Sequence, residues 1–387
     1  MPFPHSKQIV PVDSVETFDI SEVASEVSID IVENRVLKPG EYAILPEDEL
    51  TLIPPAILTN STSQKVQKGF LLPEKTINGK KASAIYGSIA EACLFTPYQL
   101  IVKNDGRFLY DEHWLMPRQQ CWNAHDYAKL AQQLNVVPQK TESNIFRATI
   151  GHSSNYGHFI FNSLPLGRVL NRFLPSHNLV SSIFAPAQFI HDFFQLFKPR
   201  ETYLSNGGIA VEAKEVHFVM QLTGTSIVAL DYVRQESIKN SRDTLDGPIA
   251  LYLSRKGYRR SVENEEELIP VLNKYNITFV ETQNLSVVQQ IELFRKAYLI
   301  IGAWGAALCN CVFMPEKSII IELCDPFRFE DTYFMEWAAS ARCNYVKVVG
   351  VAKADDGLGR SSPNPSQENF VIQPELLDEV LEQFFSL

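Results

Sequence analysis

The sequence lacks the features by which membrane-spanning, secreted and nucleic-acid-binding proteins are usually recognised. No uninterrupted apolar run approaches the roughly 20 residues of a membrane-spanning helix, and no signal-peptide core follows the first residues. Positive charge is scarce as well. The 387 residues carry a net charge of −10, which opposes unspecific binding to nucleic acid or anionic lipid. We therefore expect a cytoplasmic protein without a nucleic-acid partner, while peripheral membrane contact and oligomeric state stay open.

The motifs of many metal- and cofactor-dependent enzymes are also missing. The six cysteines show no Cys-x-x-Cys spacing, a scatter typical of reduced thiols rather than of a zinc site. There is no Asp-x-Asp motif of the kind used where a metal ion bridges a diphosphate. P-loop and Gly-x-Gly-x-x-Gly motifs are absent too. We expect neither a bound metal nor a resident cofactor.

What the sequence does contain is enough apolar material for a large folded core, since 45% of its residues are hydrophobic and 21% are charged. A chain of this length suits two domains. The first part is strand-rich, and Asn-Asp-Gly at 104–106 predicts a hairpin turn. Residues 355–366 have the composition of a loop.

The second half of the sequence shows a regular alternation of short apolar strands with helices of period 3.6. Such alternation predicts right-handed βαβ units and a parallel sheet. We expect an α/β protein with an N-terminal domain over residues 1–243 and a C-terminal domain over residues 244–387. A final amphipathic helix is expected at residues 374–386.

The strongest local signal is a glycine-containing turn between the strand expected at residues 299–303 and the helix expected at residues 306–313. Gly305 and Ala306 are small enough for helix N-terminal amides to approach a phosphate group. In open α/β sheets, ligands bind at the carboxyl ends of strands, where this turn lies. The alternative is that the glycine merely permits a tight turn.

A basic segment follows the strand that ends at Ser254. It contains Arg255, Lys256, Arg259 and Arg260 in a chain that is acidic overall. Arg255 stands at the carboxyl end of the strand, where a guanidinium could contact a diphosphate through two hydrogen bonds. For Lys256 and Arg259, a solvated loop balanced by the glutamates at 265–267 is the simpler interpretation.

Glu322 is a carboxylate at the end of an apolar strand. Burying a lone carboxylate is costly unless it has a partner. Ribose hydroxyls would provide one, by the logic of the acidic residue in dinucleotide-binding folds. A salt bridge to a nearby arginine is the alternative.

In the N-terminal half, His158 is expected in the first turn of a helix, and Asn162 lies one helical turn further along. The two side chains would share a helix face. A histidine can act as a general base near neutral pH. A histidine beside aromatic residues is, however, more often structural.

Taken together, three blocks of the sequence resemble glycosyltransferase family 61, which includes bacterial capsular-polysaccharide proteins and plant xylan-decorating enzymes. The blocks are residues 155–165, 253–268 and 285–323. The resemblance implies a GT-B-like fold of two Rossmann-type lobes, with the donor in the C-terminal lobe and the acceptor in the cleft. It also implies inversion at the anomeric carbon, generally without a bound metal.

The resemblance assigns roles to the candidate residues. His158, with Asn162, becomes the candidate base for the acceptor hydroxyl. The departing diphosphate would be stabilised by Arg255 and the backbone at Gly305 and Ala306. The wider donor site would include Arg260, Trp304, Asn310 and Glu322, the last two holding the nucleotide.

Two residues depart from the family pattern. Trp304 stands where the family usually has histidine before Gly-Ala, and it could stack on a base or sugar or simply fill space. Asn162 stands where the family usually has a carboxylate. An asparagine can orient His158 but cannot stabilise an imidazolium electrostatically.

We therefore expect an inverting, metal-independent hexosyl- or pentosyltransferase of surface polysaccharide biosynthesis. It would use a nucleotide sugar as co-substrate and a glycan, a lipid-linked glycan or another hydroxyl compound as acceptor. One alternative is a GT-B-type epimerase or hydrolase that acts on the sugar nucleotide. The other is a catalytically silent nucleotide-sugar-binding subunit.

Overall fold

A computed structural model shows how the chain folds. It describes residues 17–18, 20–22, 24–49, 56–59, 81–96, 100–103, 108–109, 139–148, 155–174, 179–184, 187–197, 202–205, 209–220, 227–241, 247–329, 331–352 and 368–385. The turn expected at 104–106 and the loop expected at 355–366 lie outside these residues.

The chain divides into two compact units. The first comprises Met1–Glu47 and Lys81–Thr223, and the second comprises Asp48–Lys80 and Gly224–Leu387. This division differs from the boundary expected at residue 243. Helix α6 (Ile227–Lys239) belongs to the second unit, and strand β4 (Ala56–Thr59) pairs with the sheet of that unit.

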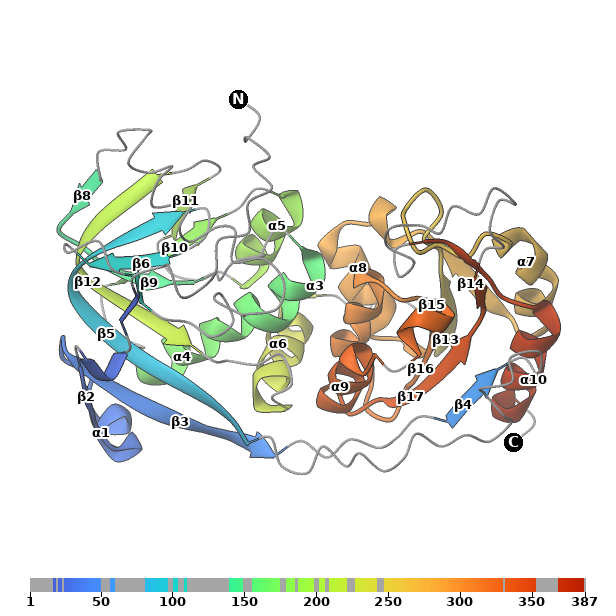
Figure 1. Ribbon diagram of the computed structural model, residues 1–387, viewed down its shortest axis with the longest axis horizontal. Coiled ribbons are helices and arrows are strands. Elements are labelled where there is room, and N and C mark those ends of the chain that lie inside the picture. Colours follow the sequence, from blue (N-terminus) through green and yellow to red (C-terminus); the bar gives the residue numbers. More distant parts are fainter. Residues whose placement is uncertain are drawn as a thin grey trace. The chain divides into compact units, whose positions relative to one another are not determined.

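The first unit contains a mixed sheet with helices between some of its strands (Figure 1). Its strands are β1 (Thr17–Phe18), β2 (Ser25–Glu26), β3 (Glu41–Glu49), β5 (Lys81–Thr96), β6 (Leu100–Lys103), β7 (Phe108–Leu109), β8 (Gln139–Thr141), β9 (Asn144–Arg147), β10 (Leu179–Phe184), β11 (Thr202–Ser205) and β12 (Ile209–Met220). Its helices are η2 (Ile20–Glu22), α1 (Ile29–Asn34), α3 (Tyr156–His158), the π-helical η3 (Phe159–Ser163), η4 (Leu164–Leu166), α4 (Gly167–Phe173) and α5 (Gln188–Phe197).

This sheet differs from the Rossmann-type lobe implied by the resemblance. Strands β9, β10 and β11 are parallel, as in a βαβ unit. The long strands β5 and β12, however, pair antiparallel from Ile209 opposite Thr96 to Met220 opposite Ile85, and β12 joins this pair to β9. The first unit is therefore only partly built from parallel βαβ units.

The second unit is built on a wholly parallel sheet. Its strands are β4, β13 (Ile249–Leu253), β14 (Ile277–Val280), β15 (Ala297–Ala303), β16 (Ile319–Cys324) and β17 (Asn344–Val349), beside a small pair, β18 (Val351–Ala352) and β19 (Phe370–Val371). Its helices are α6, α7 (Glu265–Lys274), η5 (Thr282–Asn284), α8 (Val287–Phe294), η6 (Ala306–Phe313), η7 (Pro326–Arg328), α9 (Tyr333–Ser340) and α10 (Pro374–Phe385).

The order of strands in this sheet is β14-β13-β15-β16-β17-β4. The chain runs from β13 outwards to β14, returns to β15 on the other side of β13, and then continues through β16 to β17. The direction of winding reverses between β13 and β15. In doubly wound sheets this reversal opens a crevice at the carboxyl ends of the two strands, where ligands bind.

Helices cover both faces of the parallel sheet, which explains why its strands are apolar on both sides. In Figure 1, α7 and α10 lie on one side of the sheet, and α8 and α9 lie on the other. Leu268, Leu272, Leu377 and Leu381 of α7 and α10 form one core with the strands. Helices α6, α8 and α9 pack against η6. In the part of the chain that the structure describes, no helix combines the length and apolar character of a membrane-crossing segment.

Candidate functional site

Two of the predicted donor-site residues meet at the reversal point of the parallel sheet. Arg255 follows β13, and Gly305 follows β15. A Cβ atom added to Gly305 would lie 2.7 Å from Cζ of Arg255 and still closer to its Nη1. The guanidinium therefore lies directly against the Gly305 backbone, and a residue with a side chain would displace it.

Several hydrogen bonds fix the start of the arginine-bearing loop. Arg255 Nε donates to the carbonyl oxygen of Arg259 at 2.7 Å. The backbone N–H of Arg255 donates to Oε1 of Glu265 at 3.2 Å. The Glu265 carboxylate also accepts hydrogen bonds from Ser254 Oγ at 2.7 Å and Tyr252 OH at 3.1 Å.

Glu265 is buried although it stands in the first turn of α7. Within the sequence it is one of three consecutive glutamates, which favours a solvated counter-charge. The structure shows a different role, since Glu265 ties the end of β13 to α7 and so sets where Arg255 begins.

Two further arginines lie over the indole ring of Trp304. Cζ of Arg260 is 4.3 Å from the ring centroid, and Cζ of Arg328 is 3.7 Å from it. The ring also packs edge-on against Phe334 of α9, with centroids 5.3 Å apart. Arg260 has a φ of 64°, in the left-handed region that residues other than glycine rarely adopt.

The arginines at this end of the sheet repel one another. Burial lowers the pKa of Arg255, and the nearby charge of Arg328 lowers it further. Burial lowers the pKa of Arg260 to about 10, with further lowering from Arg255 and Arg328. An anion bound among these guanidiniums would relieve both the repulsion and the cost of burial.

Two hydrogen-bond donors beside these arginines have no acceptor among the described residues. They are Nε1 of Trp304 and Nε of Arg260, and both atoms are buried. Burying a donor without an acceptor costs about 1–3 kcal/mol. The first N–H groups of η6, which starts at Ala306, likewise have no partner inside the helix. This arrangement of donors and positive charge fits a phosphate-containing ligand.

Two other predicted donor-site residues are not part of this group. Asn310 is fully buried, and its Nδ2 donates to Gln290 Oε1 and to the carbonyl oxygen of Ala307, both at 3.1 Å. Asn310 therefore connects η6 to α8. No solvent-accessible surface of Asn310 is left for a nucleotide.

Glu322 is also fully buried. Tyr345 OH donates to its Oε2 at 2.5 Å, and Nζ of Lys347 lies 3.6 Å from its Oε1. Lys347 is the register partner of Glu322 on β17 and donates to the carbonyl oxygen of Arg328 at 3.1 Å. The structure thus shows an ion pair with a lysine in place of the expected contacts to ribose or to an arginine.

The buried Glu322 gives a pH-dependent term in stability. Burial raises the pKa of Glu322 from 4.5 to about 7, against the opposing effects of Lys347 and Tyr345. Between these pH values the native protein holds a proton that the unfolded chain has released, so the free energy of unfolding falls as pH rises. The contribution of Glu322 is at most about 3 kcal/mol.

We expect Glu322→Gln to remove this decrease of the free energy of unfolding with pH, because a neutral amide has no proton to lose. Urea unfolding at several pH values between 4.5 and 7.5 measures it. The exposed Glu266, changed to Gln, is the matched control and should leave the wild-type slope unchanged. Parallel curves for the wild type and Glu322→Gln would show that Glu322 does not titrate in this window.

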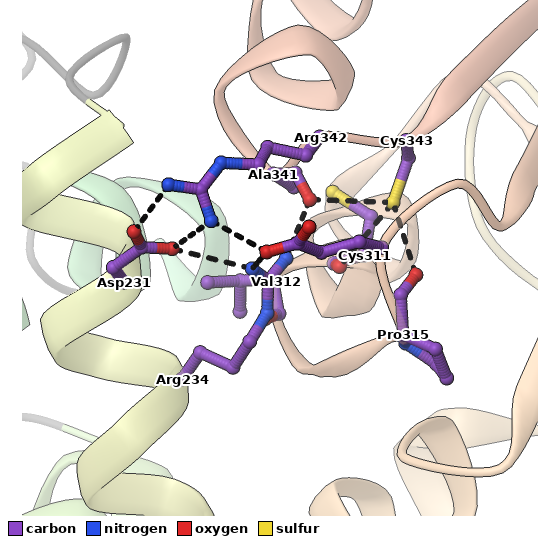
Figure 2. A network of polar contacts seen from close by, with 9 residues as sticks. Asp231, Arg234, Cys311, Val312, Pro315, Ala341, Arg342 and Cys343 are labelled. Atoms are coloured by element: carbon purple, nitrogen blue, oxygen red, sulfur yellow. Dashed lines mark hydrogen bonds and ion pairs between the residues drawn. The ribbon is translucent and has the colours of Figure 1, made fainter. Parts of the chain in front are cut away.

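A buried arginine on α6 anchors the far ends of the helices that begin beside Trp304 (Figure 2). Arg234 donates from Nε to the carbonyl oxygen of Val312 at 3.0 Å and from Nη2 to that of Ala341 at 2.5 Å. These carbonyls stand in the last turn of η6 and just after α9. Because unpaired carbonyls at helix C-termini attract cations, Arg234 stabilises both helices at once.

The predicted catalytic residues lie in the first unit. Asn155 caps α3, since its Oδ1 accepts from the N–H groups of Gly157 at 3.0 Å and His158 at 3.3 Å. His158 Nδ1 lies 3.3 Å from Asn162 Oδ1, so the two side chains share a face as expected from their spacing. Asn162 is in the π-helical η3, and π-helical turns are frequent at functional sites.

The helix that carries His158 rests on an aromatic cluster. Phe159 packs against Phe189, Phe193 and Phe194 of α5 with ring centroids 5.6–5.7 Å apart. Phe159 is fully buried, whereas His158 keeps part of its surface exposed. The packing fixes the backbone on which a partly accessible imidazole is mounted.

Metal ligation has no candidate in the described segments. Groups of three or more His, Cys, Asp or Glu side chains that could hold a metal ion are absent there. The described cysteines are free thiols: Cys93, Cys309, Cys311, Cys324 and Cys343.

Comparison with known proteins finds similarity to glycosyltransferases. Residues 156–321 match the model of the family Glycosyltransferase 61. Over 75 residues the chain is 36% identical to the EGF domain-specific O-linked N-acetylglucosamine transferase of Drosophila melanogaster. That match covers 19% of this chain and 14% of the relative.

The family match includes most of the residues considered above. It begins just before His158, contains Arg255 and Gly305, and ends one residue before Glu322. Arg328 lies beyond it, and neither the composition nor a motif of the sequence singles this arginine out. Its only signal is its position a few residues after β16, equivalent to that of Arg255 after β13.

Proposed function

We propose that this protein is a glycosyltransferase that moves a sugar from a nucleotide-sugar donor to a hydroxyl acceptor. The observation that carries the proposal is the contact of Arg255 with Gly305 at the reversal point of the parallel sheet. The second unit binds the diphosphate of the donor there. The family match and the named transferase activity of the relative support the same reaction class.

The proposed reaction is a single displacement with inversion. The acceptor oxygen attacks the anomeric carbon as the bond to the diphosphate oxygen breaks, and the acceptor proton passes to His158. Negative charge grows on the departing diphosphate, where Arg255 and the amides at Gly305 and Ala306 stabilise it. Because the guanidiniums supply this charge, the proposed mechanism needs no metal ion.

His158 is the proposed base. With Asn162 Oδ1 accepting from Nδ1–H, the imidazole keeps its lone pair on Nε2, which can take the acceptor proton. Asn162 acts here as a positioning residue. It holds the ring and the tautomer but adds no negative charge.

The acceptor is proposed only as a class. A glycan, free or lipid-linked, fits the role expected in surface polysaccharide synthesis, and the relative's name adds hydroxyl groups on EGF domains as a second type. Both present an alcohol to the base. The chemistry at His158 and Arg255 is the same for either.

A thermal-shift screen of nucleotides and sugar nucleotides tests the donor part of the proposal. Ligands that bind the native state stabilise it in proportion to ln(1 + [L]/Kd), so about 2.7 kcal/mol is gained at a hundredfold excess over Kd. We expect one family of nucleoside diphosphates to raise the melting temperature in the presence of EDTA. The absence of any shift across uridine, guanosine, adenosine and cytidine diphosphates would contradict the proposal.

Incubation of the donor found in this screen separates the transferase from two other activities. Consumption of the donor at full rate without an acceptor would indicate an epimerase or a hydrolase. Donor binding with no turnover across a panel of glycan and peptide acceptors would indicate a catalytically silent subunit. We expect turnover that depends on the acceptor.

A further inference from the structure

We propose that Arg328 is a third arginine of the pyrophosphate site and that Trp304 is the surface that holds it there together with Arg260. This inference rests on the proposed function, because it names further residues for the same donor group. It concerns a residue outside the matched segment and a tryptophan that departs from the family pattern.

The position of Arg328 follows from the order of strands. Arg328 ends η7, directly after β16, and β16 is the hydrogen-bonded neighbour of β15. Adjacent strands are about 5 Å apart, so the loops that follow β13, β15 and β16 are neighbours in space. Three successive strand ends thus supply Arg255, Trp304 and Arg328 at one edge of the sheet.

Trp304 brings two like charges to one ring. Each cation–π contact stabilises a guanidinium, but two cations on one ring also repel one another. Contacts with Tyr333 and Phe334 of α9 fix the ring, with centroids 6.3 and 5.3 Å away. A histidine at this position would add positive charge when protonated, whereas the neutral indole holds both guanidiniums without it.

Acidic and basic side chains meet at Arg328. Asp331 lies 3.1 Å from Nη1 of Arg328, and Asp325 lies 3.8 Å from its Nε. These two carboxylates orient Arg328, and Arg255 and Arg260 are its positively charged neighbours. Each phosphate of a pyrophosphate carries negative charge, and its oxygens accept the hydrogen bonds that arginine donates.

Two buried hydrogen-bond donors also support an anion site beside Trp304. Trp304 Nε1–H and Arg260 Nε–H are buried, and no described residue accepts from them. Arg260 also keeps a left-handed φ of 64°. Unpaired buried donors and unfavourable backbone geometry persist where a functional group requires them. Phosphate oxygens between Arg255 and Trp304 would satisfy these donors.

Calorimetric titration with inorganic pyrophosphate in EDTA tests the inference without knowledge of the base. The nucleoside diphosphate from the thermal-shift screen and its uncharged nucleoside serve as companions. We expect Arg328→Ala to raise the Kd of pyrophosphate and of the nucleoside diphosphate roughly ten- to hundredfold, the usual effect of losing a charged hydrogen bond. Nucleoside affinity should not change. Arg328→Lys keeps the charge but loses the planar fork, so it should fall between the wild type and Arg328→Ala.

Variants at two other positions test whether the effect is specific to Arg328 and whether it depends on the aromatic ring of Trp304. Arg342→Ala removes an arginine of the same unit that pairs with Asp231 and Glu316 instead, and it should leave the pyrophosphate Kd unchanged. Trp304→Phe and Trp304→Leu both remove the indole N–H, but only Phe keeps an aromatic face. We expect Trp304→Leu to bind pyrophosphate more weakly than Trp304→Phe.

The outcomes distinguish this inference from the proposed function. Wild-type pyrophosphate binding by Arg328→Ala and Arg328→Lys, with binding lost in Arg255→Ala, would overturn the inference and leave the transferase proposal standing. Weaker nucleoside binding by Trp304→Leu with unchanged pyrophosphate binding would show that the ring stacks on the base, which also overturns the inference. Failure of the wild type to bind any of these probes would remove both proposals.

Discussion

Replacing His158 with Gln should lower the rate of sugar transfer by about 10²–10⁴-fold, the usual contribution of a general base. The amide has a similar shape but cannot accept the acceptor proton. Binding of the nucleoside diphosphate should stay at the wild-type level, because His158 belongs to the first unit and the arginines to the second. Initial rates with donor and acceptor, together with calorimetry of the diphosphate, measure the two quantities separately.

The neighbouring Asn162 provides the control for this assignment. Asn162→Asp places a carboxylate 3.3 Å from the imidazole and should raise the pKa of His158, moving the acidic limb of the kcat/KM profile to higher pH. Asn162→Ala removes the hydrogen-bond partner of His158 and should lower the rate. It should not move the acidic limb of the kcat/KM profile to higher pH. A His158→Gln variant with the wild-type rate would show that another group takes the proton.

The architecture of the second unit could be predicted from the sequence because its elements are local. Each strand from β13 to β16 is a short, largely apolar run followed by a helical segment, and a helical crossover between neighbouring strands makes them parallel. Arg255 and Gly305 were both identified because each follows the carboxyl end of such a strand, where ligands bind in open α/β sheets. That β13 and β15 are neighbours follows from the strand order in the structure. The direct contact of Arg255 with Gly305 depends on side-chain conformation and is visible only in the structure.

The first unit and the burial of individual polar residues follow from long-range pairing. Strand β4 joins β17 across most of the chain, and β5 pairs with β12 after more than a hundred intervening residues. Local pattern carries no information about such partners. Glu322 ends an apolar run in the same way as a ligand-binding carboxylate, and only the register of β16 against β17 shows that Lys347 is its partner.

Arg328 illustrates the same limit at the site itself. It is a single arginine in a segment without any basic neighbour, so composition gives it no weight. Its place beside Trp304 results from the adjacency of β15 and β16 and from the turn of η7. The contact of Arg328 with the indole ring of Trp304 can be recognised only when the position of that ring in the structure is known.

Replacing Gly305 with Ala should impair the donor site nearly as much as removing Arg255. A Cβ at Gly305 would come within 2.7 Å of Cζ of Arg255, and the guanidinium is the flexible partner that must move. We expect each single variant to lower kcat/KM by about 10²–10³-fold, the range seen when one donor to a developing oxyanion is lost. The free energy of unfolding should change little in Gly305→Ala, because a side chain moves and the backbone does not.

A double-mutant cycle makes this prediction specific. If Gly305 matters because it makes room for Arg255, then the Gly305→Ala and Arg255→Ala changes act on one interaction, and the double variant should be no worse than Arg255→Ala alone. Gly302→Ala is the matched control from the same strand end. Its Cβ would meet Leu253 at 3.2 Å and Leu308 at 3.4 Å, so it should cost stability without altering donor affinity. Additive losses in the double variant would mean that Gly305 serves the donor independently of Arg255. The start of η6, rather than the guanidinium against it, would then be the main contact of the diphosphate.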